Sequence, residues 1–172
     1  MKHTVYLTCG LVRSGKSTWA KHIIDTEENY VIVCRDDIRT MLKGSYIYDY
    51  NIEELVSTVA ASAILKGLQE DFNIIIDETN IKKSKRSFWL NIIEQSEVPD
   101  VDSIIMFFPE VENNLENRMK NSRGYTKEKW KDVIETMKQH FEYPSIYEDK
   151  RIHSVKEVTL KNSNYKYKDI VI

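Results

Sequence analysis

The sequence predicts an α/β fold in which helices flank a doubly wound parallel sheet. Short apolar runs rich in β-branched residues alternate with segments of helical periodicity. The first of these runs leads directly into a glycine-bearing loop that precedes a helical segment. The chain has 172 residues, of which 41% are hydrophobic and 30% charged, as expected for one well-buried domain. We therefore expect residues 1–172 to form a single domain.

The glycine-bearing loop reads GLVRSGKS over residues 10–17 and lies between a predicted strand, 4–9, and a helix beginning near residue 18. This is the G-x-x-x-x-G-K-S pattern of a phosphate-binding loop, so the sheet is predicted to be of the P-loop NTPase type. Two glycines allow a tight turn whose N–H groups converge on an anion, and the helix N-terminus points at the same anion. Lys16 supplies charge for the β and γ phosphates, and the Ser17 hydroxyl is an oxygen ligand for Mg²⁺. The alternative is a glycine-bearing turn that binds no ligand.

Acidic residues follow the next two predicted strands. Residues 30–34 are expected to form a fully buried parallel strand, and Arg35-Asp36-Asp37-Ile38-Arg39 comes directly after it. Residues 73–76 form a third strand that ends in Asp77 and Glu78. Ligands bind at the carboxyl ends of such strands, and a terminal Asp commonly steadies Mg²⁺, a role we assign to Asp77. The alternative for Asp36 or Asp37 is capping of a following helical turn.

Between these two strands lie a tyrosine-rich connection and a helix. Residues 43–51 contain three tyrosines, which could stack on bases or pack the connection onto the domain. Residues 52–70 place Leu55, Val56, Ala60 and Ile64 at helical spacing, so we expect an apolar face there that acts as scaffold.

Residues 82–86 carry four positive charges, and a helix is expected from 87 to 97 with Phe88, Ile92 and Ile93 facing inward. Cations at a helix N-terminus oppose the macrodipole, so this arrangement suggests an anionic partner. A solvated basic turn is the alternative.

The second half of the chain is expected to begin with a strand at 101–108 that ends at Pro109. A helix is expected next, because Val111, Leu115 and Met119 recur at helical spacing. Six basic residues and one acid lie between 118 and 131, so we predict an Arg-rich lid at about 118–126 that closes on the nucleotide. An exposed connection between helices is the alternative. Thr126 is expected to cap a further helix, and the tail, 151–172, to form a strand followed by a hairpin partner or a loose end.

Composition excludes several other classes of protein. Net charge is −2, so any nucleic acid must be held by local patches. No apolar run is long enough to span a membrane, and no leader sequence suggests secretion, so we expect a cytoplasmic protein without a membrane partner. Cys9 and Cys34 are expected to be buried free thiols, and the four histidines show no metal-ligand spacing.

Three segments together resemble the polynucleotide 5′-hydroxyl kinases. They are GLVRSGKSTW at 10–19, Arg35-Asp36-Asp37-Ile38-Arg39, and Asp77-Glu78-Thr79-Asn80; Phe141-Glu142-Tyr143-Pro144-Ser145 with Glu148 is similar to the end of such kinase domains. The resemblance covers about residues 4–158. Arg13 stands where these kinases commonly have Gly, and Glu78 where they have Asp or Asn. The chain lacks their D-x-D-x-T phosphatase signature, which implies a kinase domain standing alone.

The resemblance also implies roles for individual residues. Asp36 would activate the acceptor hydroxyl, and Arg39 would hold the acceptor's phosphate. Thr79 would line the acceptor site, to which we add Arg86 from the basic run. Of the two lid arginines, Arg118 would lie near the adenine and Arg123 on the transferring phosphate. The residues expected to bind the nucleotide are therefore Gly10, Arg13, Ser14, Gly15, Lys16, Ser17, Thr18 and Arg118.

The sequence thus predicts an ATP- and Mg-dependent kinase of 5′-hydroxyl DNA or RNA ends, as in nucleic-acid repair. Asp36, Lys16 and Arg123 are the expected catalytic residues. Two alternatives are a kinase of a small hydroxyl compound, such as a nucleoside, sugar or antibiotic, and a nucleotide-dependent switch that has no acceptor.

Overall fold

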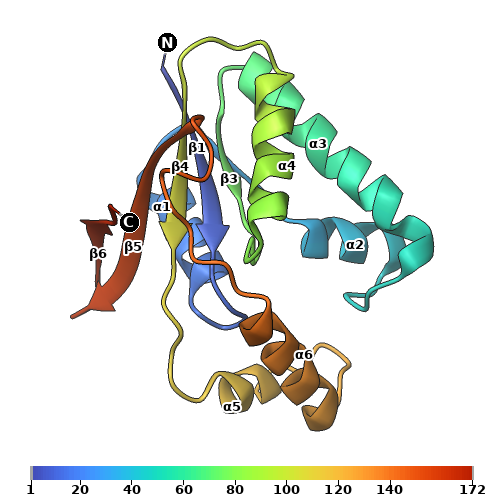
Figure 1. Ribbon diagram of the computed structural model, residues 1–172. Coiled ribbons are helices and arrows are strands. Elements are labelled where there is room, and N and C mark those ends of the chain that lie inside the picture. The colour runs from blue at the N-terminus through green and yellow to red at the C-terminus, as the bar shows by residue number, and fades with distance from the viewer. Residues whose placement is uncertain (1, 172) are drawn as a thin grey trace.

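The computed structural model describes residues 2–171 and contains a six-stranded sheet of order β2-β3-β1-β4-β5-β6 (Figure 1). The strands are β1 (His3–Cys9), β2 (Tyr30–Val33), β3 (Asn73–Ile76), β4 (Val101–Phe107), β5 (Ile152–Lys161) and β6 (Asn164–Asp169). The helices are α1 (Lys16–Thr26), α2 (Arg35–Lys43), α3 (Glu53–Gln69), α4 (Lys83–Glu94), α5 (Asn114–Met119) and α6 (Lys127–Gln139), with a 3₁₀ turn η1 at Tyr50–Ile52.

The sheet is mostly parallel, which confirms the predicted fold class. Strand β1 lies in the middle and pairs in parallel with β3 and β4, and only β6 runs antiparallel to its neighbour. Because β1 to β5 are parallel, their carboxyl ends meet at one edge of the sheet. The loops that follow β1, β2 and β3 carry the phosphate loop and the acidic motifs, so the topology brings these motifs together.

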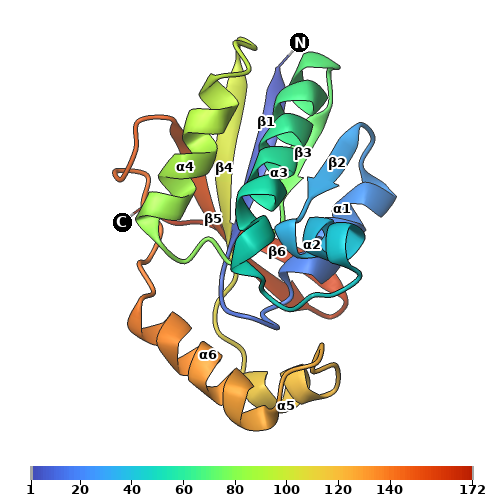
Figure 2. The ribbon, with the colours of Figure 1, turned by 90° about the vertical axis from the view of Figure 1, so that its right-hand side faces the viewer.

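Helices cover both faces of the sheet, as expected for a doubly wound fold. Alternate residues of β1 point to opposite faces: Val5 and Leu7 belong to the core under α3 and α4, whereas Tyr6 packs on the other face against Trp19 of α1. Figure 2 shows α3 and α4 side by side over one face, with α5 and α6 beyond the carboxyl end of the sheet. Thr126 caps α6 as predicted, because its hydroxyl accepts a hydrogen bond of 3.2 Å from the Lys129 N–H.

Three expectations about burial within the strands and helices were wrong. Strand β2 is an edge strand and three of its four residues are only half-buried, because no strand covers its outer side. Leu55 is 51% exposed, since the buried stripe of α3 runs through Val56 and Ala60. Phe88 is 36% exposed, because α4 begins at Lys83 and turns Arg86 and Trp89 inward instead.

The remaining differences concern boundaries and the tail. The motif after β2 is itself helical, since α2 begins at Arg35. The tail forms the hairpin that was one of its two predicted outcomes, and Asn162 and Ser163 make its turn with φ of 49° and 62°. Both cysteines are free, but Cys34 is half-buried rather than buried. None of the helices within residues 2–171 has the length and apolar character that a membrane crossing requires.

Candidate functional site

A cavity of about 590 Å³ lies at the carboxyl edge of the sheet. It is bounded by the phosphate loop, the start of α2, the end of β3 and the α5–α6 pair. The predicted site residues that line it are Arg13, Gly15, Lys16, Ser17, Thr18, Asp36, Asp77, Thr79, Arg118 and Arg123. The structure therefore brings most of the expected site together, including segments that are about 100 residues apart in the sequence.

The phosphate loop has the backbone that its sequence pattern predicts. Gly15 has φ of 99°, a left-handed conformation that favours glycine, and it precedes the first residue of α1. Arg13 also has positive φ, 59°, so it takes the conformation that the more common glycine would take without strain. At Gly10 a Cβ atom would lie only 2.7 Å from the carbonyl oxygen of Phe108, so the close approach of β4 requires glycine there.

Lys16 lies folded across this loop and is only 8% exposed. Its ammonium donates hydrogen bonds to the Leu11 carbonyl at 2.6 Å and to the Ser14 hydroxyl at 3.3 Å. Burial lowers the pKa of Lys16 to about 8, against the attraction of the nearby Asp77 carboxylate. A cation removed from water in this way binds an incoming phosphate more strongly than a solvated one does.

Ser17 and Asp77 are the candidate metal ligands. Asp77 is buried and its pKa is raised by loss of hydration, while the Ser17 hydroxyl donates a hydrogen bond to its carboxylate. A hydroxyl and a carboxylate oxygen, completed by phosphate oxygens and water, form the donor set that Mg²⁺ prefers. The residues present thus fit a Mg²⁺ ion bound jointly with a nucleotide. Within residues 2–171, no group of three or more acidic, His or Cys side chains could hold a metal ion on its own.

Asp36 and Asp37 both lie in the first turn of α2, and both line the cavity. Neither one is the N-cap, which is Cys34, so the capping alternative is wrong. The Asp36 carboxylate accepts a hydrogen bond of 2.8 Å from Arg39, whose guanidinium also bonds both oxygens of Glu53, at 2.6 and 3.1 Å. Arg39 is 6% exposed and absent from the cavity wall, which contradicts its expected role as an open phosphate clamp. Its geometry instead fixes the orientation of Asp36.

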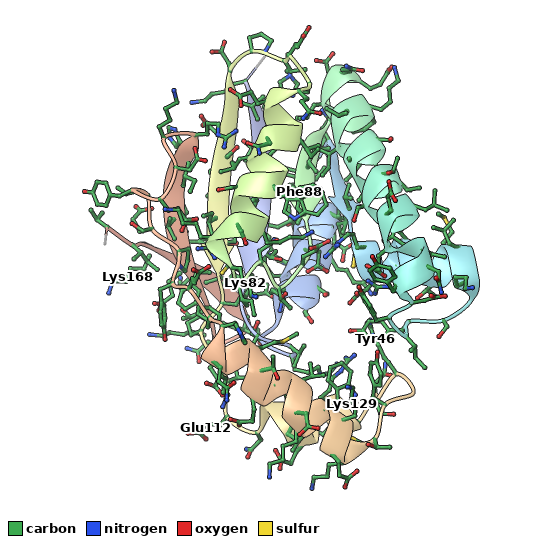
Figure 3. All side chains as sticks on the ribbon, turned by 45° about the vertical axis from the view of Figure 1, so that its right-hand side comes forward. Tyr46, Lys82, Phe88, Glu112, Lys129 and Lys168 are labelled. Carbon is green, nitrogen blue, oxygen red and sulfur yellow. The ribbon has the colours of Figure 1, made fainter. Side chains whose placement is uncertain are left out.

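The α5–α6 pair reaches the same carboxylate from the opposite side. The Arg123 guanidinium lies 3.8 Å from Asp36, and the ring of Tyr46 lies 4.3 Å from Arg123 and 5.4 Å from Arg118. Figure 3 shows Tyr46 on the α2–α3 connection, on the side toward the α5–α6 pair. Arg118 also stacks over Trp130 at 4.1 Å and is 5% exposed, which lowers its pKa through loss of hydration. The tyrosine-rich connection therefore packs onto the domain, and it does so through the two lid arginines.

Glu78, which departs from the pattern of the polynucleotide kinases, pairs with Arg35. Both carboxylate oxygens of Glu78 accept hydrogen bonds from this guanidinium, one of them at 3.1 Å. Burial raises the pKa of Glu78, and the Arg35 charge opposes that shift. The pair closes the cavity beside Thr79, whose carbonyl accepts a hydrogen bond of 2.9 Å from the Gly10 N–H.

Arg86 does not belong to the acceptor side, which corrects the sequence-based assignment. Its side chain is fully buried and bonds both oxygens of Glu148 at 2.6 Å. The same guanidinium donates to the carbonyls of Asn80 and Glu142, at 2.8 and 3.1 Å. All of these partners belong to the scaffold, so Arg86 joins α4 to the segment after α6.

Sequence reasoning missed several residues of the cavity wall. They are Val12, Lys21, Ile32, Cys34, Asn117 and Met137. Tyr46 also lines the cavity, although the sequence did not assign it to the site. Lys21 follows the loop by one helical turn, and that spacing is the only signal that could have identified it. No sequence pattern connects Tyr46 with Arg118, because the two residues meet only through the fold.

The chain also matches known proteins. A family model described as "AAA domain" matches residues 5–144. Two similar solved chains, titled "Structure of Pnkp1/Rnl/Hen1 complex" and "Structure of the Pnkp1/Rnl/Hen1 RNA repair complex", have 26% and 25% identity and TM-scores of 0.60 and 0.63. They match 73% and 83% of this chain but only 40% and 47% of their own length, so this chain spans less than half of either. A third solved chain, titled "Crystal Structure of Fungal RNA Kinase", has 12% identity to this chain. The match covers 94% of this chain and 77% of the fungal chain, and the TM-score of 0.70 shows that the two share a fold.

Proposed function

We propose that this chain, which belongs to the AAA domain family, is a kinase that transfers the γ-phosphoryl group of ATP to a 5′-hydroxyl of DNA or RNA. The observation that carries the proposal is the 3.8 Å approach of Arg123 to Asp36 on the wall of the cavity that holds the phosphate loop. In this position the carboxylate can remove the proton of an attacking hydroxyl, and the guanidinium can stabilise the charge on the transferring phosphoryl group.

Each part of the site has a separate task in this reaction. Lys16 and the amides of the phosphate loop bind the β and γ phosphates. Ser17 and Asp77 would hold a Mg²⁺ ion, which would supply positive charge to the phosphates. The residues 118–126 act as a lid that carries Arg118 to the base of the nucleotide and Arg123 to the γ phosphate.

Asp36 is the proposed general base. As the acceptor's 5′-oxygen bonds to the γ phosphorus, its proton passes to the Asp36 carboxylate, and the bond from the γ phosphorus to the bridging oxygen of ADP breaks. Arg39 holds that carboxylate through a 2.8 Å hydrogen bond, while Glu53 compensates the buried charge of Arg39. Arg123 offsets the charge that develops on the transferring group.

The choice of a nucleic-acid acceptor rests on the resemblance in motifs and on the two similar chains, one of which is titled as part of an RNA repair complex. One observation favours a small hydroxyl compound instead. Arg39 and Arg86 are both enclosed by carboxylates, so neither adds free positive charge to the acceptor side. The two proposals differ in whether acceptor phosphates improve binding.

Incubation with labelled ATP and a panel of acceptors tests the proposal. The panel is a 5′-hydroxyl DNA oligonucleotide, an RNA oligonucleotide, single nucleosides and a sugar. We expect transfer to an oligonucleotide and a loss of about 10²-fold or more in Asp36→Asn, the usual scale for removing a general base. Asp37→Asn is the matched control and should lose much less. Transfer to nucleosides or sugar alone would contradict the nucleic-acid assignment, and an inactive Asp37 variant beside an active Asp36 variant would contradict the choice of base.

A further inference from the structure

A second cavity, of about 430 Å³, lies beside the candidate active site. It shares Arg35, Glu78 and Thr79 with the first cavity, so these residues form a common wall between two adjacent cavities. Its other side is formed by the start of α4, and we call the part lined by Lys82, Ser84, Lys85 and Phe88 the lysine groove. Figure 3 shows Lys82 directly before the start of α4 and Phe88 on the helix itself.

In the part of the chain that the structure describes, the charges of the lysine groove are not held in ion pairs, although the Glu78 and Glu53 carboxylates attract the Lys85 ammonium from a distance. The first turn of α4 contains no acidic residue, although cations there oppose the helix dipole. Lys85 is half-buried, with its ammonium 4.6 Å from the Phe88 ring centre and 4.8 Å from that of Trp89. Within residues 2–171, neither Lys82 nor Lys85 forms an ion pair with a carboxylate. The loss of hydration lowers the pKa of Lys85, so this cation is kept in place at a cost to stability.

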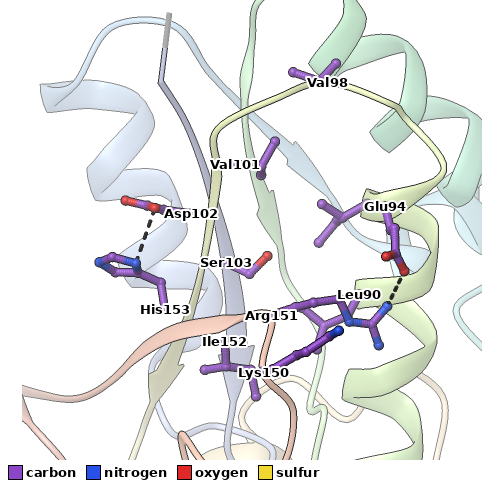
Figure 4. A pocket seen from close by; sticks show the side chains of 11 residues that line it. Leu90, Glu94, Val98, Val101, Asp102, Ser103, Lys150, Arg151, Ile152 and His153 are labelled. Carbon is purple, nitrogen blue, oxygen red and sulfur yellow. Dashed lines mark hydrogen bonds and ion pairs between the residues drawn. The ribbon is translucent and has the colours of Figure 1, made fainter.

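A third cavity, of about 500 Å³, shows the opposite pattern (Figure 4). It lies where β4 and β5 begin, at the other end of the sheet from the phosphate loop. Arg151 there pairs with Glu94 at 2.8 Å and with Asp149 at 2.6 Å. These carboxylates already satisfy the guanidinium, so Arg151 is much less open to an anion than Lys82 and Lys85 are.

We propose that the lysine groove binds the nucleotides that lie 3′ to the reacting end of a single-stranded nucleic acid. The backbone phosphates contact Lys82 and Lys85, and a base or sugar packs on the exposed 36% of Phe88. A chain of phosphates alternating with apolar ring faces matches a groove that alternates ammonium groups with an aromatic ring. The inference rests on the proposed function and adds a subsite to it, since Thr79 lies on the wall of both cavities.

The test measures the acceptor KM against acceptor length, from a nucleoside 3′-phosphate through di- and tetranucleotides to a decamer. We expect KM of the unmodified chain to fall at least tenfold between one and four nucleotides. The double variant Lys82→Gln/Lys85→Gln should remove that gain while leaving kcat on the nucleoside 3′-phosphate unchanged. For single strands each phosphate contact contributes about 0.7 to the log–log slope of affinity against salt, so the double variant should lose a slope of about 1.4.

Two further variants sharpen the test. Lys150→Gln removes an exposed lysine of the third cavity and should leave length dependence and salt slope intact. Phe88→Leu keeps the apolar contact but removes the ring face, and should raise KM only for acceptors of two or more nucleotides. A KM that is flat with length, or unchanged in the double variant, would overturn the lysine groove while leaving the kinase assignment intact. Transfer to non-nucleotide alcohols alone would overturn both.

Discussion

Replacing Arg86 distinguishes a structural ion pair from a substrate-binding residue. Arg86→Met keeps much of the buried volume but leaves Glu148, whose side chain is 7% exposed, without its partner. Breaking a buried pair in this way costs about 3–5 kcal/mol in the free energy of unfolding. For a chain of this size each kcal/mol lowers the melting temperature by about 2–4 °C, so we expect a decrease of about 6–20 °C. Thermal unfolding followed by circular dichroism measures it.

A matched double variant separates the effect of the charge from that of the hydrogen bonds. Arg86→Met/Glu148→Met removes both charges and should recover part of the loss. Recovery should be incomplete, because the carbonyls of Asn80 and Glu142 lose the hydrogen bonds of 2.8 and 3.1 Å that Arg86 donates to them. Each carbonyl left unsatisfied in the interior costs about 1–3 kcal/mol. The reasoning is refuted if Arg86→Met melts within 2 °C of the unmodified chain and instead raises the acceptor KM.

Three further predictions concern the phosphate loop. Gly10→Ala should lower the free energy of unfolding by roughly 1–3 kcal/mol and weaken ATP binding, because the added Cβ would lie 2.7 Å from the Phe108 carbonyl oxygen. Urea unfolding measures the stability and calorimetry measures the ATP affinity. An unchanged stability and affinity would contradict the close approach of the two segments. The pKa of Lys16 in the folded chain is about 8, below its ordinary value of 10.5. The free-energy cost of burying the charge is therefore full below pH 8 and is relieved as the pH rises to 10.5. The free energy of unfolding should rise across that pH window in the unmodified chain but not in Lys16→Met. Nucleotide phosphates favour the charged form of Lys16, so this amine should take up about half a proton from the buffer when ATP binds at pH 8, and almost none at pH 6.5. Calorimetry in buffers of different ionisation enthalpy measures the uptake, and equal uptake in the Lys16→Met variant would contradict the assignment.

Much of the fold could be predicted from the sequence because its signals are local. The phosphate loop, the apolar strands and the Thr126 cap each depend on residues within a few positions of one another. The edge position of β2 could not be predicted, because the run Tyr30–Val33 is as apolar as a central strand and only the sheet order leaves it half-covered. Helix α2 was missed because Arg35 and the residues after it were interpreted through their charges, whereas a single turn of α-helix already places Asp36 beside Arg39.

The arginines show where sequence reasoning stops. Arg39, Arg86 and Arg123 all belong to segments that suggest anion binding, yet their environments differ. Arg86 meets Glu148, 62 positions away, and Arg39 meets Glu53, 14 positions away, so carboxylates that no local pattern connects with them neutralise both. Arg123 also approaches a carboxylate, Asp36, but at 3.8 Å and on the cavity wall, with a third of its side chain still exposed to solvent.

This difference determines which cations an incoming phosphate can use. A guanidinium that already bonds both oxygens of a buried carboxylate has to give up those bonds before it can bind a new anion, and the carboxylate would then be left buried and unpaired. At Arg123 and in the lysine groove no such exchange is needed, because their charges are not held by bidentate, buried carboxylates. The protein has a net charge of −2, and its capacity to bind anions is therefore set by the few cations that its own carboxylates leave open, rather than by the number of basic residues in each segment.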